Sequence, residues 1–75
     1  MAEDVYAAQR EELMSLLTRM KRTGEGLLLH GEPRLNSDDA AVILQKLSRG
    51  HSFSRRERAA LTDAGFDLPA LFPGV

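Results

Sequence analysis

The side chains with the clearest binding chemistry form a basic cluster in the second half of the chain: Arg49, His51, Arg55, Arg56 and Arg58. Guanidinium groups make bidentate hydrogen bonds to carboxylates and phosphates, so the cluster suits an acidic protein surface or a nucleic-acid backbone. Arg55 and Arg56 would lie in the first turn of a helix, where the helix dipole disfavours cations. They therefore need counter-charges, either from a partner or from acids of the chain such as Asp38, Asp39 or Asp63.

The helix that carries these arginines has sequence signals for both of its ends. Ser54 and Glu57 fit a capping box, in which each side chain accepts a hydrogen bond from the backbone N–H of the other residue. Gly65 can adopt the left-handed conformation that ends a helix, and Phe66 would then pack over Leu61 as in a Schellman motif. We predict a short helix here, the second member of a helical pair spanning residues 37–64.

Two other helices are predicted from apolar spacing. Between Asp4 and about Arg22 the apolar residues recur at helical intervals, namely Tyr6, Leu13, Leu16, Leu17 and Met20. Gly24 follows where a helix-ending glycine belongs. The second helix can be capped by Asn36 or Ser37 and ends at Gly50. Its buried stripe is predicted to be Ala40, Ile43, Leu44 and Leu47.

Two segments leave alternatives open. Residues 27–30 are apolar but too few for periodicity to classify, and the turn signal at 31–33 allows a hairpin that pairs 27–30 with 33–35. We favour an irregular or short extended connection, because an isolated two-stranded ribbon is marginally stable. The C-terminal residues Phe66, Leu68, Leu71 and Phe72 are expected to fold back onto the core. In the alternative, Leu71 and Phe72 dock into a groove of a partner.

Length and composition favour one small all-α domain over residues 1–75: three helices, the irregular or short extended connection after the first helix, and a packed C-terminal segment. Seventy-five residues without cysteine bury a modest core, so homo-oligomerisation or a partner would add stability. The formal net charge of −1 disfavours a general nucleic-acid binder.

Several functional classes find no support in the sequence. His30 and His51 lack metal-ligand spacing, and no nucleophile elbow or phosphate-binding glycine loop occurs, so we expect no metal, no cofactor and no enzyme activity. No apolar run approaches the length of a membrane span. The first residues are acidic and lack signal-peptide features, so a cytoplasmic protein without a membrane partner is expected.

By elimination, the favoured function is a non-enzymatic interaction protein that binds an acidic macromolecular surface through the basic cluster. A regulator, inhibitor, adaptor or accessory subunit fits this description, and small phage or bacterial accessory proteins share the profile by analogy only. The alternative is a nucleic-acid-binding protein that uses the capped helix in a helix-turn-helix-like arrangement. Against it, the residues from Arg49 to Ser54 exceed the turn of roughly 3 to 4 residues that joins such helices.

Overall fold

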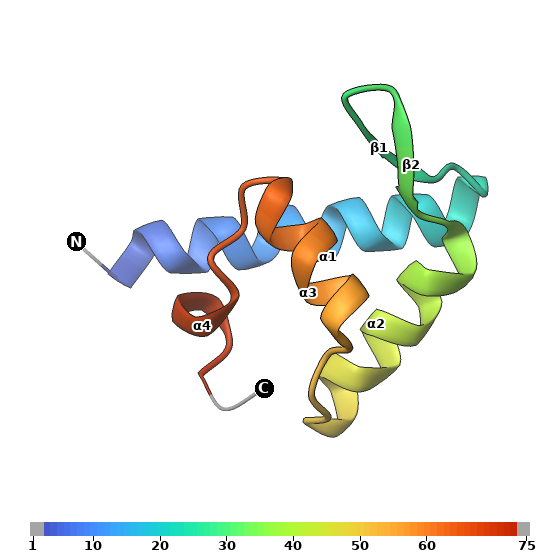
Figure 1. Cartoon of the computed structure of the whole chain (residues 1–75). Helices are drawn as coiled ribbons and strands as arrows, with labels where there is room; N and C mark the ends of the chain where they lie inside the picture. Colours follow the sequence, from blue (N-terminus) through green and yellow to red (C-terminus); the bar gives the residue numbers. More distant parts are fainter. Residues whose placement is uncertain (1–2, 74–75) are drawn as a thin grey trace.

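The computed structural model describes residues 3–73 as a mostly helical domain with four helices and a small antiparallel sheet (Figure 1). The element order is α1 (Glu3–Thr23), β1 (Leu27–Leu29), β2 (Glu32–Leu35), α2 (Ser37–Arg49), α3 (Arg55–Asp63) and α4 (Leu68–Leu71). The predicted three-helix, all-α fold is therefore correct in its helical class and needs two corrections. The connection after α1 forms a hairpin, and the C-terminal segment contains a fourth, single-turn helix.

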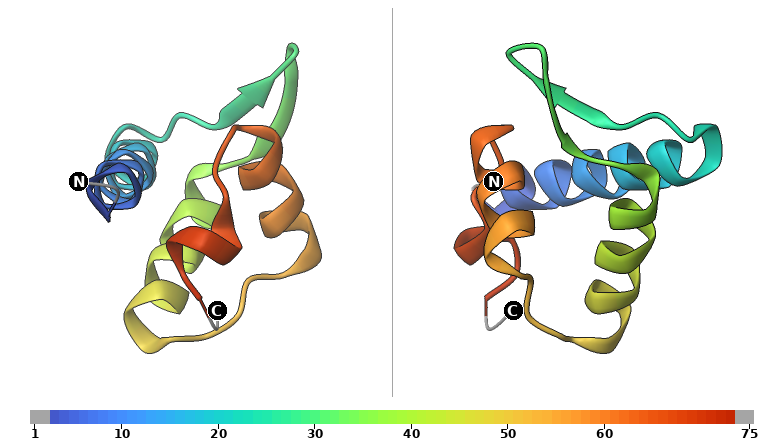
Figure 2. Two further views of the ribbon diagram at one scale, coloured as in Figure 1. Left: turned by 90° about the vertical axis from the view of Figure 1, so that its left-hand side faces the viewer. Right: turned by 45° about the vertical axis from the view of Figure 1, so that its right-hand side comes forward.

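The core lies between α1 and a layer made by the other three helices, and α1 is seen end-on in one view of Figure 2. Its apolar members come from every helix, from β2 and from the connection between α2 and α3: Leu13, Leu17, Met20, Leu35, Ala40, Ile43, Phe53, Ala60, Leu61, Leu68 and Leu71. Of the predicted stripes, Leu13, Leu17, Met20, Ala40 and Ile43 are buried. Leu16, Leu44 and Leu47 are partly buried and pack against the core, and Tyr6 is the exception. Tyr6 is 43% exposed, because the packing against α1 is incomplete near its N-terminal end. None of the helices described between residues 3 and 73 has the length and apolarity to span a bilayer.

The predicted helix ends of α2 and α3 are confirmed in atomic detail. Asn36, rather than Ser37, caps α2: its Oδ1 accepts from the Asp39 backbone N–H, and its own backbone N–H donates to the Asp39 carboxylate, which completes a capping box. Ser54 and Glu57 form the corresponding box on α3. At the other end, the N–H of Gly65 donates to Thr62 O at 3.0 Å and that of Phe66 to Leu61 O at 3.1 Å, the hydrogen bonds of a Schellman motif. Local sequence therefore fixes where these helices begin and end.

The C-terminal segment folds back onto the core, as expected. Leu68 and Leu71 are each 2% exposed, and Phe66 and Phe72 pack against the core while partly buried. The rings of Phe53 and Phe72 meet edge to face, with centroids 6.3 Å apart. This contact joins the chain between α2 and α3 to the end of α4.

The hairpin of β1 and β2 depends on a two-residue turn, His30-Gly31, in which φ is positive at both residues. Such a turn matches the twist of the flanking strands, but it prefers Asn-Gly or Asp-Gly, which is why the sequence signal was weak. The pairing leaves Arg34 as an extra residue on β2, and its guanidinium reaches Asp63 of α3 at 2.8 Å. Gly26 lies so close to β2 that a Cβ would approach Leu35 O to 2.7 Å.

Replacing His30 by Asn is expected to stabilise the protein, because His30 holds φ at 53°, a left-handed conformation that asparagine tolerates better. We expect the free energy of unfolding to increase by about 0.5 kcal/mol, which corresponds to a rise in Tm of roughly 2–4 °C. Thermal unfolding followed by circular dichroism measures it. His51→Asn is the matched control, since His51 is also exposed but does not have positive φ. An equal rise in both variants would contradict the explanation.

Candidate partner-binding site at the α2–α3 junction

The five predicted site residues all lie at the junction of α2 and α3, but they differ in whether their side chains already have partners within the chain. The junction runs from Gly50 to Ser54. Gly50 ends α2 in a left-handed conformation, and the N–H of His51 donates to Lys46 O at 2.8 Å. Phe53 anchors the connection in the core, with 6% of its surface exposed. The backbone that presents the cluster is therefore held at both helix ends and in its middle.

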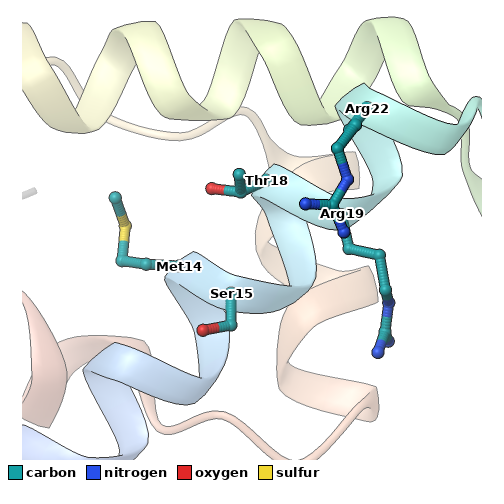
Figure 3. Close-up of a pocket in the computed structure, with 5 residues that line it drawn as sticks. All are labelled: Met14, Ser15, Thr18, Arg19 and Arg22. Atoms are coloured by element: carbon teal, nitrogen blue, oxygen red, sulfur yellow. The ribbon is translucent and has the colours of Figure 1, made fainter.

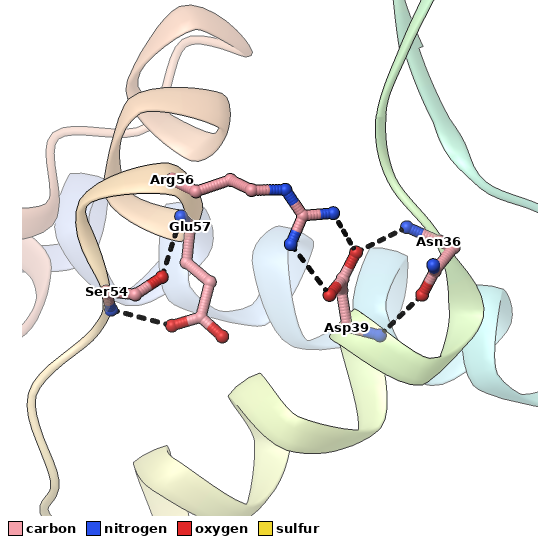
Figure 4. Close-up of polar contacts among 5 residues, drawn as sticks. All are labelled: Asn36, Asp39, Ser54, Arg56 and Glu57. Atoms are coloured by element: carbon pink, nitrogen blue, oxygen red, sulfur yellow. Dashed lines mark hydrogen bonds and ion pairs between the residues drawn. The ribbon is translucent and has the colours of Figure 1, made fainter.

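Arg56 is engaged by an acid of the chain itself. Its guanidinium makes a bidentate contact with Asp39 in the first turn of α2, with nitrogen–oxygen distances of 3.1 and 2.7 Å (Figure 4). The Arg56 hydrogen bonds, which outweigh the opposing effect of burial, lower the pKa of Asp39. Asp39 also completes the capping box of α2. Arg56 thus links the start of α3 to the start of α2. The Asp39 carboxylate is the counter-charge that offsets the unfavourable position of Arg56 in the first turn of α3.

A second ion pair at the junction was missed from the sequence. Glu57 is 4% exposed, and its Oε1 accepts from Lys46 Nζ at 2.6 Å and from the Ser54 N–H at 2.7 Å. Burial by itself would raise the pKa of Glu57, but the Lys46 ammonium and the Ser54 N–H together hold it below its ordinary value. The sequence signal was available, because Glu57 lies on the same helix face as the buried Ala60 and Leu61.

The other four predicted residues differ in their exposure and in whether they have an interaction partner. Arg58 is half-buried and engaged in an interaction of its own. Arg49, His51 and Arg55 are exposed, and across residues 3–73 none of their side chains forms an ion pair. We call these three residues the junction patch. Of the acids proposed as counter-charges, Asp39 pairs with Arg56 and Asp63 pairs with Arg34, and among the described residues Asp38 is in no ion pair, so none of the three neutralises the junction patch.

Metal-binding geometry is missing from the described part of the chain. His30 lies in the hairpin turn and His51 at the opposite end of α2, so the two histidines do not converge. Residues 3–73 contain no group of three His, Cys, Asp or Glu side chains that could hold an ion.

A hollow of about 420 Å³ lies on the outer surface of α1 (Figure 3). Its lining residues all belong to this helix: Met14, Ser15, Thr18, Arg19 and Arg22. Because no second element supplies a wall, the hollow is open and its side chains are not held in a fixed convergent geometry. Arg19 and Arg22 are exposed and, among the described residues, are not in ion pairs, so they form a second basic surface.

Comparison with known proteins gives no assignment: no family model, no curated protein and no solved structure matches this chain.

Proposed function

We propose that the chain is a non-enzymatic interaction protein that binds an acidic protein surface through Arg49, His51 and Arg55. The observation that supports this most directly is that some basic residues at the junction have carboxylate partners and others do not. Neighbouring cations Lys46 and Arg56 have carboxylate partners at 2.6–2.7 Å, whereas the junction patch has none within residues 3–73. Arg49 and Arg55 are exposed on the adjoining ends of two helices, so little backbone entropy is lost when they bind carboxylates.

An acidic protein is a better partner than nucleic acid for two reasons. The net charge of −1 gives the whole molecule no long-range attraction for a polyanion. In a helix-turn-helix arrangement, side chains near the start of the second helix would read the bases. Here the guanidinium of Arg56 at that position is already bound to Asp39, so base contact would have to break a bidentate ion pair. Nucleic-acid binding therefore stays the alternative proposal.

The double variant Arg49→Ala, Arg55→Ala is expected to weaken binding to an acidic polypeptide by about tenfold, since two charged hydrogen-bond donors are lost. The probe is poly-L-glutamate, titrated against the full chain by fluorescence anisotropy at low salt. Arg19→Ala, Arg22→Ala is the matched control, because it removes the same charge from exposed positions without ion pairs. The control should retain most of the affinity of the wild type.

Equal losses of affinity in the two double variants would show that binding depends on overall charge and would contradict a specific role of the junction patch. A titration with duplex DNA tests the alternative. Tight binding of DNA with a steep loss of affinity as salt rises would favour nucleic acid over protein. Circular dichroism spectra and Tm values of all variants should match the wild type, because these side chains are exposed.

A further inference from the structure

The hairpin presents a sheet edge to solvent on each side. The described sheet has two strands only; its turn end projects from the helical layers (Figures 1 and 2), whereas Leu27 and Leu35 at its base pack on the core. A strand edge with free N–H and C=O groups is a template for another strand. Whether an edge can be used depends on its backbone donors and on its side chains, and in these respects β1 and β2 differ.

The edge of β2 is blocked. In a hairpin closed by a two-residue turn, the residues that flank the turn are hydrogen-bonded to each other, here Leu29 and Glu32. The next pair, Leu28 and Pro33, is therefore the non-hydrogen-bonded pair, whose backbone groups point outward. Proline has no N–H to offer at that edge. The bulge at Arg34 and the charges of Glu32 and Arg34 further disfavour an added strand.

The edge of β1 has no such protection. The register directs the N–H and C=O of Leu28 away from β2, so both are available to a new strand. Leu28 is 62% exposed, the largest value among the large apolar side chains described between residues 5 and 73. The strand Leu27–Leu29 contains no charged residue, no proline and no glycine. Proteins usually protect exposed edges with charged residues or proline.

We propose that β1 pairs antiparallel with β1 of a second copy of the chain, so that two hairpins form a continuous four-stranded sheet. A twofold axis through the Leu28 position lets each Leu28 donate its N–H to the carbonyl of the other Leu28. The two exposed Leu28 side chains then lie directly opposite each other on one face and shield one another from water. Leu27 of each copy lies opposite Leu29 of the other.

A second copy suits this edge because the pairing opposes no like charges. The strand itself is neutral, and the flanking residues are unlike: Glu25 of one copy comes to the His30-Gly31 turn of the other. The contact is small, since only the edge of a three-residue strand and its flanks take part. We therefore expect a reversible dimer with a Kd on the order of 100 μM rather than a permanent one.

Sedimentation velocity of the full chain over a range of concentrations measures the association. The wild type should shift toward dimer as concentration approaches about 1 mM. Leu28→Lys places a charge on the edge of each copy, and Leu28→Pro removes the outward N–H while leaving the hairpin bonds intact, as Pro33 already does on β2. Each variant should raise Kd at least about tenfold. Val42→Lys, which replaces another exposed apolar residue on α2, is the matched control and should dimerise like the wild type.

Amide hydrogen exchange locates the interface independently of any variant. The Leu28 amide should exchange fast in dilute wild-type protein and slow down as concentration rises, in parallel with dimer formation. A protein that stays monomeric to about 1 mM overturns the proposal, as does a dimer that Leu28→Lys leaves unchanged. In the second case, loss of the dimer in Tyr6→Lys would place the interface at the N-terminal end of α1 instead. Far-UV circular dichroism confirms that the variants compared are folded.

Discussion

Replacing Glu57 by Ala is expected to lower the free energy of unfolding by about 3 kcal/mol, a large part of the stability of a domain this small. The carboxylate is almost fully buried and accepts hydrogen bonds from Lys46 and from the Ser54 backbone. Alanine would leave the Lys46 ammonium, whose side chain is 25% exposed, without its counter-charge. It would also remove half of the capping box of α3. Urea denaturation followed by circular dichroism measures the loss.

Glu57→Gln removes the negative charge but keeps the capping box, because the glutamine side chain can still accept a hydrogen bond from the Ser54 N–H. We expect it to cost about half as much as Glu57→Ala, the remaining loss being that of the ion pair with Lys46. Lys46→Met provides the reciprocal test, since it removes the ammonium but keeps an apolar stem. If the free energies of unfolding of Glu57→Ala and Glu57→Gln both lie within about 0.5 kcal/mol of the wild-type value, the buried ion pair does not form in solution.

Acid should destabilise the wild type more than the Glu57→Gln variant. The folded-state pKa of Glu57 lies below its ordinary value of 4.5, and that of Asp39 is lowered as well. A group with a lowered folded-state pKa contributes stability above its unfolded pKa, and this contribution is lost as the pH falls through the folded-state value. The difference in urea midpoint between the wild type and Glu57→Gln should therefore shrink between pH 7 and about pH 3. A constant difference would contradict the lowered pKa of Glu57.

The parts of the structure that were predictable from sequence are those fixed by near neighbours in the chain. The capping box of Ser54 and Glu57 spans three residues, and the Schellman hydrogen bond from Phe66 to Leu61 spans five. Such contacts involve residues within one or two turns of each other, so their signals can be read without knowing the tertiary fold. The same locality explains why Asn36 and Ser37 could not be separated: both side chains can cap a helix, and only the position at which α2 leaves β2 selects Asn36.

The charge pattern at the junction depends on distances that the sequence does not contain. Arg56 and Asp39 are 17 positions apart, and Asp38 or Asp63 was an equal candidate until α2 and α3 were placed relative to each other. Lys46 and Glu57 likewise come together only because of how α2 and α3 are placed relative to each other. The sequence allows the hairpin without selecting it, because its turn uses His30, an uncommon residue at positive φ, where an asparagine would give a clear signal. Tertiary packing therefore decides which of the junction cations remain free to bind a partner.

Replacing Phe53 by Ala is expected to cost about 3–4 kcal/mol and to loosen the C-terminal segment. The Phe53 ring is buried at the junction and packs edge to face on Phe72, so its removal opens a cavity between the α2–α3 connection and the end of α4. Phe53→Leu, which keeps much of the volume, should cost about 1 kcal/mol. In hydrogen exchange, the Phe72 amide, which donates to Leu68 O at 2.8 Å, should lose protection in the alanine variant. A loss below about 1 kcal/mol with unchanged protection would show that the packing of the C-terminal segment does not depend on the Phe53–Phe72 contact.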